Sequence, residues 1–159
     1  MTRIATCVAT IVVIMFVATF FLPQWAECAG KVHYIYARVT FHNAGPNRKT
    51  CLGRRQRARM LAVNTCNLKS NPLPFSAQAQ IIAYLDRSGY SHEQKLPTGV
   101  VADKFGRRAM RQVNRRMSLP SRGGFIRQPC YRIDYYFVGK MTPAMQQCNT
   151  KICKVAVYY

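Results

Sequence analysis

The stretch from Arg115 to Lys140 constrains the fold most, because it combines a clear strand pattern with a turn, a cysteine and many cations. Tyr131 to Val138 is rich in β-branched and aromatic residues, which predicts a strand. Ser121 to Gly124 supplies the backbone freedom of a turn, and Pro129 lacks a backbone donor where the next strand should begin. We therefore expect a hairpin-like unit whose two strands are Gly124 to Arg127 and Tyr131 to Val138.

Residues 1–28 have the pattern of a signal peptide. Arg3 supplies a positive charge, residues 4–22 are almost continuously apolar, and Ala26 and Cys28 are small residues suited to the positions before a cleavage site. We predict cleavage after Cys28 or Ala29, secretion, and a single domain over residues 29–159. A transmembrane anchor is the alternative, since the apolar run is long enough to span a bilayer. The sequence has no second such run, so we expect no stable membrane insertion after cleavage.

Five cysteines remain after this cleavage. In an exported protein an odd set of this size predicts two disulfides and one leftover thiol. The pairing stays open, with a preference for a bond from the first two cysteines to one of the last two. The spacing of the last two cysteines, with no histidine nearby, argues against zinc, so we expect neither a metal nor a cofactor. The five candidates are Cys51, Cys66, Cys130, Cys148 and Cys153.

Alternating patterns predict further strands. Val32 to Phe41 alternates with Val32, Tyr34 and Tyr36 on the inward side, followed by Val39 and Phe41 after a slip in phase. Gln80 to Leu85 is followed directly by a turn, which favours a strand over a helix. Ile152 to Tyr159 also alternates, with Val155, Val157 and Tyr159 on one face.

Arg54 to Leu68 contains mostly good helix formers, which predicts a helix. One early helix followed by several strands is typical of an α+β fold. We therefore expect one helix packed on a curved antiparallel sheet, stabilised by disulfides.

Positive charge is the strongest functional signal. The net charge is +19, and cleavage after residue 28 would leave it unchanged, because it removes one base and one acid. This exceeds the magnitude of about 2 to 8 that keeps a small domain soluble. Arginine outnumbers lysine, which favours bidentate contacts with phosphate. We expect a monomer that binds RNA or an RNA-rich particle such as the ribosome, through Arg107, Arg108, Arg111, Arg115, Arg116, Arg122, Arg127 and Arg132. A second cluster, on the expected helix, contains Arg54, Arg55, Arg57 and Arg59.

Three strings resemble the small secreted fungal ribonucleases, and most closely the RNase-like effector candidates of powdery-mildew fungi. They are Thr50 to Gly53, Leu119 to Ile126, and Pro129 to Ile133. The resemblance implies a ribonuclease-like fold with a disulfide between its N-terminal and C-terminal parts. It places Arg132 where active members have the arginine that contacts the scissile phosphate, and Ser118 where they have the general base. A second register, built on Glu93 and Pro97, brings His92 beside that acid but loses the match at Arg132.

Catalysis is not expected from these residues. RNA cleavage needs a base and an acid within hydrogen-bond reach of the substrate, and Ser118 cannot accept a proton near neutral pH. The resemblance thus implies a catalytically inactive effector that binds host RNA or ribosomal particles and interferes with host defence. The acids and histidines of the predicted mature chain form no catalytic motif; they are Asp86, Glu93, Asp103, Asp134, His33, His42 and His92.

Other functions remain open on the sequence alone. One is an effector that binds a host protein and uses the fold as a scaffold. Others are an active secreted ribonuclease and a cationic antimicrobial protein. Translocation into host cells after secretion is a further open point. Salt-dependent RNA binding separates the RNA-binding prediction from the host-protein alternative, and vesicle leakage identifies a membrane-active protein.

Overall fold

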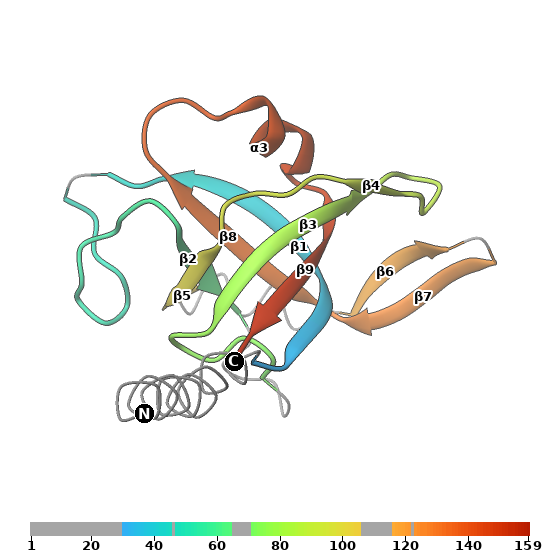
Figure 1. Cartoon of the computed structure of the whole chain (residues 1–159), viewed down its shortest axis with the longest axis horizontal. Helices are drawn as coiled ribbons and strands as arrows, with labels where there is room; N and C mark the ends of the chain where they lie inside the picture. The colour runs from blue at the N-terminus through green and yellow to red at the C-terminus, as the bar shows by residue number, and fades with distance from the viewer. Residues whose placement is uncertain (1–29, 46, 65–70, 106–115, 122) are drawn as a thin grey trace, which may run out of the picture. The chain divides into compact units, whose positions relative to one another are not determined.

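Strands dominate the part of the chain that the computed structural model describes, which comprises residues 30–45, 47–64, 71–105, 116–121 and 123–159. Seven strands form the main sheet (Figure 1). They are β1 (Val32–Asn43), β2 (Met60–Val63), β3 (Gln78–Leu85), β4 (Ser91–Glu93), β5 (Gly99–Lys104), β8 (Tyr131–Phe137) and β9 (Ile152–Tyr158). A separate two-stranded ribbon contains β6 (Arg116–Ser121) and β7 (Gly124–Pro129), and α3 (Pro143–Cys148) is a short helix.

The main sheet closes on itself. Its strand order is β4-β3-β5-β2-β8-β1-β9, and β9 pairs additionally with β3. β1 runs parallel to β8 and β2 runs parallel to β5, whereas the other neighbours are antiparallel. Ala79 of β3 therefore lies between Gly99 of β5 and Val157 of β9. Closure leaves little unpaired strand edge, which makes the sheet a rigid support for the loops that leave it.

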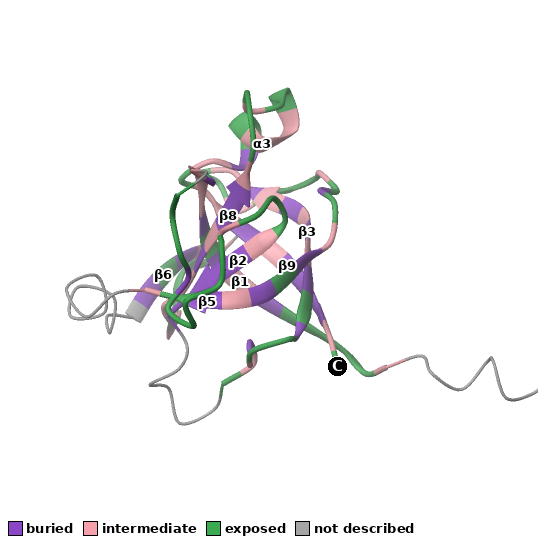
Figure 2. Cartoon of the chain, turned by 90° about the vertical axis from the view of Figure 1, so that its left-hand side faces the viewer, coloured by how far each residue is buried: buried purple, intermediate pink, exposed green. Residues whose placement is uncertain are grey.

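Aliphatic side chains fill the inside of the closed sheet. Val39, Val63 and Val157 are fully buried, and Figure 2 shows such buried positions along the strands. Each buried aliphatic side chain stabilises the fold by about 1.5–3 kcal/mol. Gly99 allows a close approach of neighbouring strands, because a Cβ there would lie 2.8 Å from the Leu61 side chain and 2.9 Å from the Arg59 carbonyl oxygen.

The expected fold class is wrong. The described residues form a closed mixed sheet with parallel and antiparallel pairs, not an antiparallel sheet covered by one helix. In place of the helix from Arg54 to Leu68, the chain runs as a loop to Arg59, which has a left-handed φ of 64°, and then enters β2. Leu61 and Val63 of β2 are buried between β5 and β8. Tertiary packing of these two side chains overrides the helix propensity of their neighbours.

The four strands expected from alternating or β-rich patterns are confirmed as β1, β3, β8 and β9. The inward face of β1 was predicted correctly only in its second half. Val39 is buried and Phe41 packs against the core, as predicted. In the first half Ile35 and Ala37 are buried instead, whereas Val32 and Tyr34 are 43% and 60% exposed. On β9 Val155 and Val157 are buried as predicted, while Tyr159 is exposed. The outer surface of the sheet therefore carries tyrosines that the sequence pattern had assigned to the core.

The unit from Arg115 to Lys140 is also arranged differently from the prediction. The turn at Ser121 to Gly124 joins β6 to β7, and Ser121 and Gly124 are register partners. β8 belongs to the main sheet instead of pairing with β7. Pro129 ends β7, where a residue without a backbone donor is tolerated.

The helix α3 follows from two residues that predicted only a turn. Thr142 is its N-cap and accepts a hydrogen bond from the amide of Met145 at 3.3 Å, and Pro143 occupies the first turn. Both residues are favoured at these positions. The threonine hydroxyl oxygen accepts from a backbone amide that has no partner within the helix, and proline has no amide hydrogen that would need a partner.

The predicted disulfide stabilisation is wrong for the described cysteines. Cys51, Cys130, Cys148 and Cys153 are free thiols, and Cys66 lies outside the described residues. Cys51 is exposed on a loop, whereas Cys148 and Cys153 are buried near α3, and the Cys153 thiol donates to the Cys148 carbonyl oxygen at 3.7 Å. Closure of the sheet supplies the link between the two ends of the fold that a disulfide was expected to supply. The predicted signal peptide lies outside the described residues.

Candidate phosphate-binding surface

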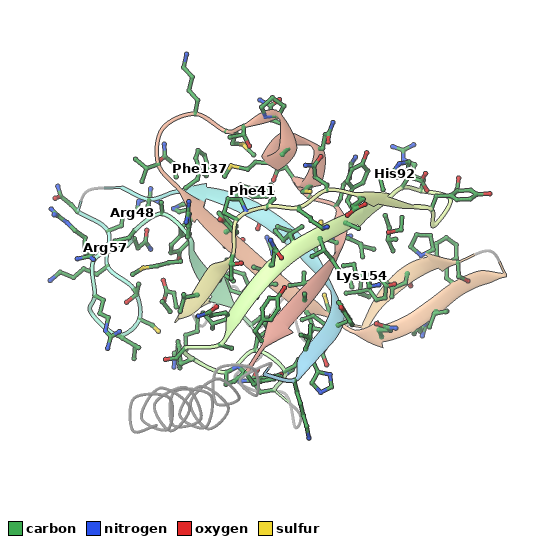
Figure 3. The ribbon with its side chains drawn as sticks, in the orientation of Figure 1. Phe41, Arg48, Arg57, His92, Phe137 and Lys154 are labelled. Atoms are coloured by element: carbon green, nitrogen blue, oxygen red, sulfur yellow. The ribbon has the colours of Figure 1, made fainter. Side chains whose placement is uncertain are left out.

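A dense group of cations lies on the loop between β1 and β2. Half of its twelve residues from Arg48 to Arg59 are Arg or Lys, and none is Asp or Glu. All six of these cationic residues are exposed, and Figure 3 shows the side chains of Arg48 and Arg57 at the same end of the sheet. We refer to Arg48, Lys49, Arg54, Arg55, Arg57 and Arg59 as the basic loop.

Backbone hydrogen bonds give the basic loop a defined shape. Lys49 and Arg55 form an antiparallel bridge, and the Gln56 amide donates to the Arg48 carbonyl oxygen at 2.9 Å. The turn between them is closed by the amide of Thr50, which donates to the Arg54 carbonyl oxygen at 2.7 Å. The bridge therefore places Lys49 and Arg55 opposite one another.

A buried carboxylate anchors this loop to the sheet. Asp103 of β5 is 4% exposed and accepts hydrogen bonds from the Cys51 amide at 2.6 Å and the Lys104 amide at 2.8 Å. It also accepts a hydrogen bond from the Tyr136 hydroxyl at 2.9 Å. Burial and this carboxylate raise the pKa of Tyr136, so the phenol stays protonated and remains a donor. Gln56 extends the network by donating to the same hydroxyl at 3.3 Å.

The cations of the bridge line a hollow of about 320 Å³ together with Asn47 and Arg48. Its charged lining residues are Arg48, Lys49 and Arg55, and none is acidic. Arginine presents a planar fork of donors that matches phosphate oxygens, and lysine adds a point charge. The hollow thus has the size and charge to hold a phosphate group.

His42 positions one side of this hollow. Its Nε2 atom contacts the Arg48 guanidinium, and its ring packs against Tyr136 with centroids 5.5 Å apart. Burial lowers the pKa of His42, and the neighbouring Arg48 lowers it further. A neutral imidazole can accept a hydrogen bond from the guanidinium, which restrains the arginine without neutralising its charge.

Most of the predicted RNA-binding arginines cannot be placed. Arg107, Arg108, Arg111, Arg115 and Arg122 lie outside the described residues, and of Arg116 only the backbone, at the start of β6, is described. Arg127 is exposed on β7, whereas Arg132 is half-buried on β8 in the other sheet. The Arg132 guanidinium lies 5.5 Å from the centre of the Phe105 ring. The sequence predicted Arg54, Arg55, Arg57 and Arg59 as a cluster on a helix, but it did not predict that Arg55 lines one hollow together with Arg48 and Lys49.

Asp134 is one of the acids for which the sequence predicted no catalytic motif. It pairs with Thr40 across β8 and β1, and the Thr40 hydroxyl donates to its carboxylate. Burial raises the pKa of Asp134 to about 6, although the nearby Arg132 acts in the opposite direction. Such a carboxylate suits proton transfer, but catalysis also needs an acid or base partner placed on the substrate.

His92 forms an exposed ion pair, but with a different acid from the Glu93 that the second ribonuclease register had placed beside it. His92 pairs with Asp86 at 2.9 Å, while Glu93 pairs with Lys95 at 2.9 Å. Within the described ranges, no group of three or more His, Cys, Asp or Glu side chains could hold a metal ion. No helix among the described residues is long and apolar enough to cross a membrane.

Comparison of the chain with protein-family models, curated proteins and solved structures gives no match in any of the three.

Proposed function

We propose that the protein is a secreted RNA-binding protein that contacts phosphates through the basic loop. The hollow lined by Arg48, Lys49 and Arg55 carries this proposal, because three cations converge there without an acidic neighbour in its lining. The proposed secretion rests on the pattern of residues 1–28. Binding of ribosomal particles through the same phosphate contacts belongs to this proposal.

An effector role rests on a narrower basis. The helix-on-sheet fold implied by the ribonuclease resemblance is not found, so only the local strings remain in its favour. Our proposal includes interference with host defence and the absence of RNA cleavage.

RNA suits this surface better than a generic acidic protein. A phosphate backbone presents evenly repeated negative charges, and each neutralised phosphate releases bound counterions. The loop is held open by its backbone bridge and by Asp103, so its cations need little reordering on binding. The chain as a whole adds a net charge of +19, which accelerates encounter with a polyanion.

The test compares two triple variants that lose the same positive charge, one inside the hollow and one outside it. In one variant Arg48, Lys49 and Arg55 are replaced together by Gln. In the control, Lys31, Arg87 and Lys140, which are exposed elsewhere, are replaced by Gln. Each variant loses the same formal charge.

Single-stranded RNA binding is measured by fluorescence anisotropy over a range of salt. We expect the slope of log K against log salt to become shallower by about 2 in the first variant, since three contacts contribute about 0.7 each. The control should change it far less. Equal effects of the two variants would show that net charge, and not the basic loop, governs binding.

A further inference from the structure

A second hollow lies on the outer surface of the closed sheet, across β1, β9 and β3. Ala156 of β9 pairs with Tyr34 of β1 on one side and with Gln80 of β3 on the other. In the next row, Lys154 pairs with Tyr36 and with Ala83. Large side chains thus surround a small one at the centre of this face.

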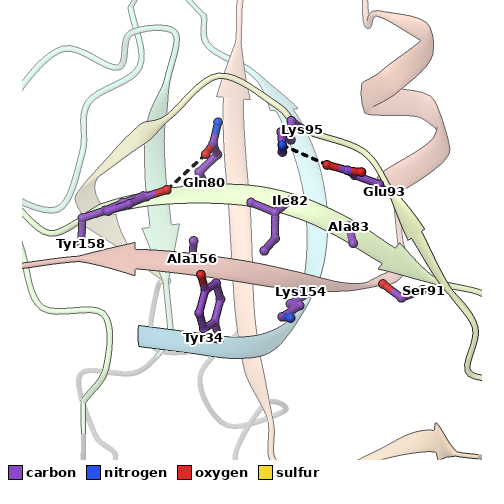
Figure 4. A pocket seen from close by; sticks show the side chains of 10 residues that line it. All are labelled: Tyr34, Gln80, Ile82, Ala83, Ser91, Glu93, Lys95, Lys154, Ala156 and Tyr158. Atoms are coloured by element: carbon purple, nitrogen blue, oxygen red, sulfur yellow. Dashed lines mark hydrogen bonds and ion pairs between the residues drawn. The ribbon is translucent and has the colours of Figure 1, made fainter. Parts of the chain in front are cut away.

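This arrangement produces a groove of about 520 Å³. Ala156 and Ala83 contribute short side chains to its lining, and Ile82, which also lines it, lies where the register between β3 and β9 shifts. Figure 4 shows Tyr34, Lys154 and Tyr158 around it. The Tyr158 hydroxyl donates to the Gln80 side-chain oxygen at 3.2 Å, which fixes one wall of the groove.

An exposed ring and a cation share this groove. Tyr34 is 60% exposed, and the Lys154 ammonium lies 4.8 Å from the centre of its ring. Lys95 is neutralised by Glu93, whereas Lys154 makes no ion pair within the part of the chain that the structure describes.

We propose that this groove binds an unpaired base of single-stranded RNA, which stacks on Tyr34 while Lys154 contacts the adjacent phosphate. Aromatic rings combined with cations are the usual means of binding single strands without sequence preference. Bases of a duplex are already stacked and cannot offer a face to the ring. The inference rests on the proposed function and adds selectivity for single strands, which the basic loop alone would not provide.

The experiment compares a short oligouridylate with a strand of equal length and charge that lacks bases. Tyr34→Leu removes the ring, and Tyr90→Leu is the matched control, because Tyr90 is 55% exposed outside the groove. We expect Tyr34→Leu to weaken binding of the oligouridylate about tenfold, as expected for the loss of one stacked base. Its affinity for the strand without bases should not change. Tyr90→Leu should leave both affinities unchanged.

Lys154→Gln provides a second measurement if Tyr34→Leu does not fold. It should weaken binding of both strands, since its contact is with phosphate. Equal affinities of the unaltered protein for the two strands, with no effect of Tyr34→Leu, would overturn the groove and leave the proposed function standing. Failure to bind either strand would overturn both. Binding of a neutral oligosaccharide that depends on Tyr34 would assign the groove to glycans and overturn the inference.

Discussion

Replacing Asp103 by Ala separates the shape of the basic loop from its charge. Asp103 accepts three hydrogen bonds, from the amides of Cys51 and Lys104 and from the hydroxyl of Tyr136. Cys51 is exposed, so its amide can turn to water, but Tyr136 is only 6% exposed and its hydroxyl would stay buried. A buried donor without a partner costs about 1–3 kcal/mol. With the weakened amide contacts, we expect the free energy of unfolding to fall by about 2–4 kcal/mol.

The same substitution raises the net charge by one from +19. Long-range attraction alone would therefore strengthen RNA binding. Loss of the Cys51 contact should instead loosen the loop and weaken binding about fivefold, because the cations must then be ordered on binding. Tyr136→Phe removes one of the three hydrogen bonds without changing charge, and it should shift stability and affinity in the same direction by less.

Urea unfolding followed by circular dichroism gives the stability of each variant, and fluorescence anisotropy gives its affinity for single-stranded RNA. Affinity is measured at a temperature where the variant is fully folded. A folded Asp103→Ala protein that binds RNA more tightly than the unaltered protein would refute the argument that the shape of the loop matters.

Three further predictions follow from the described residues. Burial raises the pKa of Asp134 from 3.8 to about 6, so the native state binds the carboxyl proton more tightly than the unfolded state does. Protonation of Asp134 therefore stabilises the native state below about pH 4, and this stabilisation is lost as the pH rises through 6. Asp134→Asn should therefore stabilise the protein at pH 7 by about 1–2 kcal/mol, after allowance for the partial exposure of Asp134. It should also reduce the fall in stability between pH 4 and 7. Urea-unfolding profiles that do not change would contradict this prediction. Dithiothreitol should leave Tm unchanged, because the described cysteines are free thiols. A thiol reagent should modify Cys51 in the native protein but reach Cys148 and Cys153 only on unfolding. A disulfide detected by mass spectrometry would contradict this prediction. Single-stranded RNA incubated at neutral pH should remain intact, and cleavage that disappears in Asp134→Asn would show that the protein is a ribonuclease.

Strands with strong local patterns could be predicted from the sequence. β3, β8 and β9 each alternate or carry β-branched residues, so their pattern and their packing agree. β1 was located, but its first half was assigned to the wrong face, because an exposed tyrosine and a buried tyrosine look alike in an alternating pattern. Only the structure shows that Ile35 faces inward and that Tyr34 faces the groove.

The conformation of the basic loop could not be predicted from local sequence patterns. Its arginines are good helix formers, so the chain from Arg54 to Leu68 was predicted to form a helix. The buried Asp103 that anchors the loop is 52 positions from Cys51 in sequence, and no local pattern links them. Closure of the sheet through β3 and β9 likewise depends on non-local pairing that the sequence pattern does not specify.

Nuclear magnetic resonance titration of the labelled protein with a short single-stranded RNA tests the phosphate site most directly. If the basic loop binds phosphate, the Nε resonances of Arg48 and Arg55 and the amide resonance of Lys49 should shift first and saturate together, and added salt should reverse the shifts. Shifts confined to Arg127 and the neighbouring residues of β7, with the basic loop unaffected at saturation, would contradict the proposal.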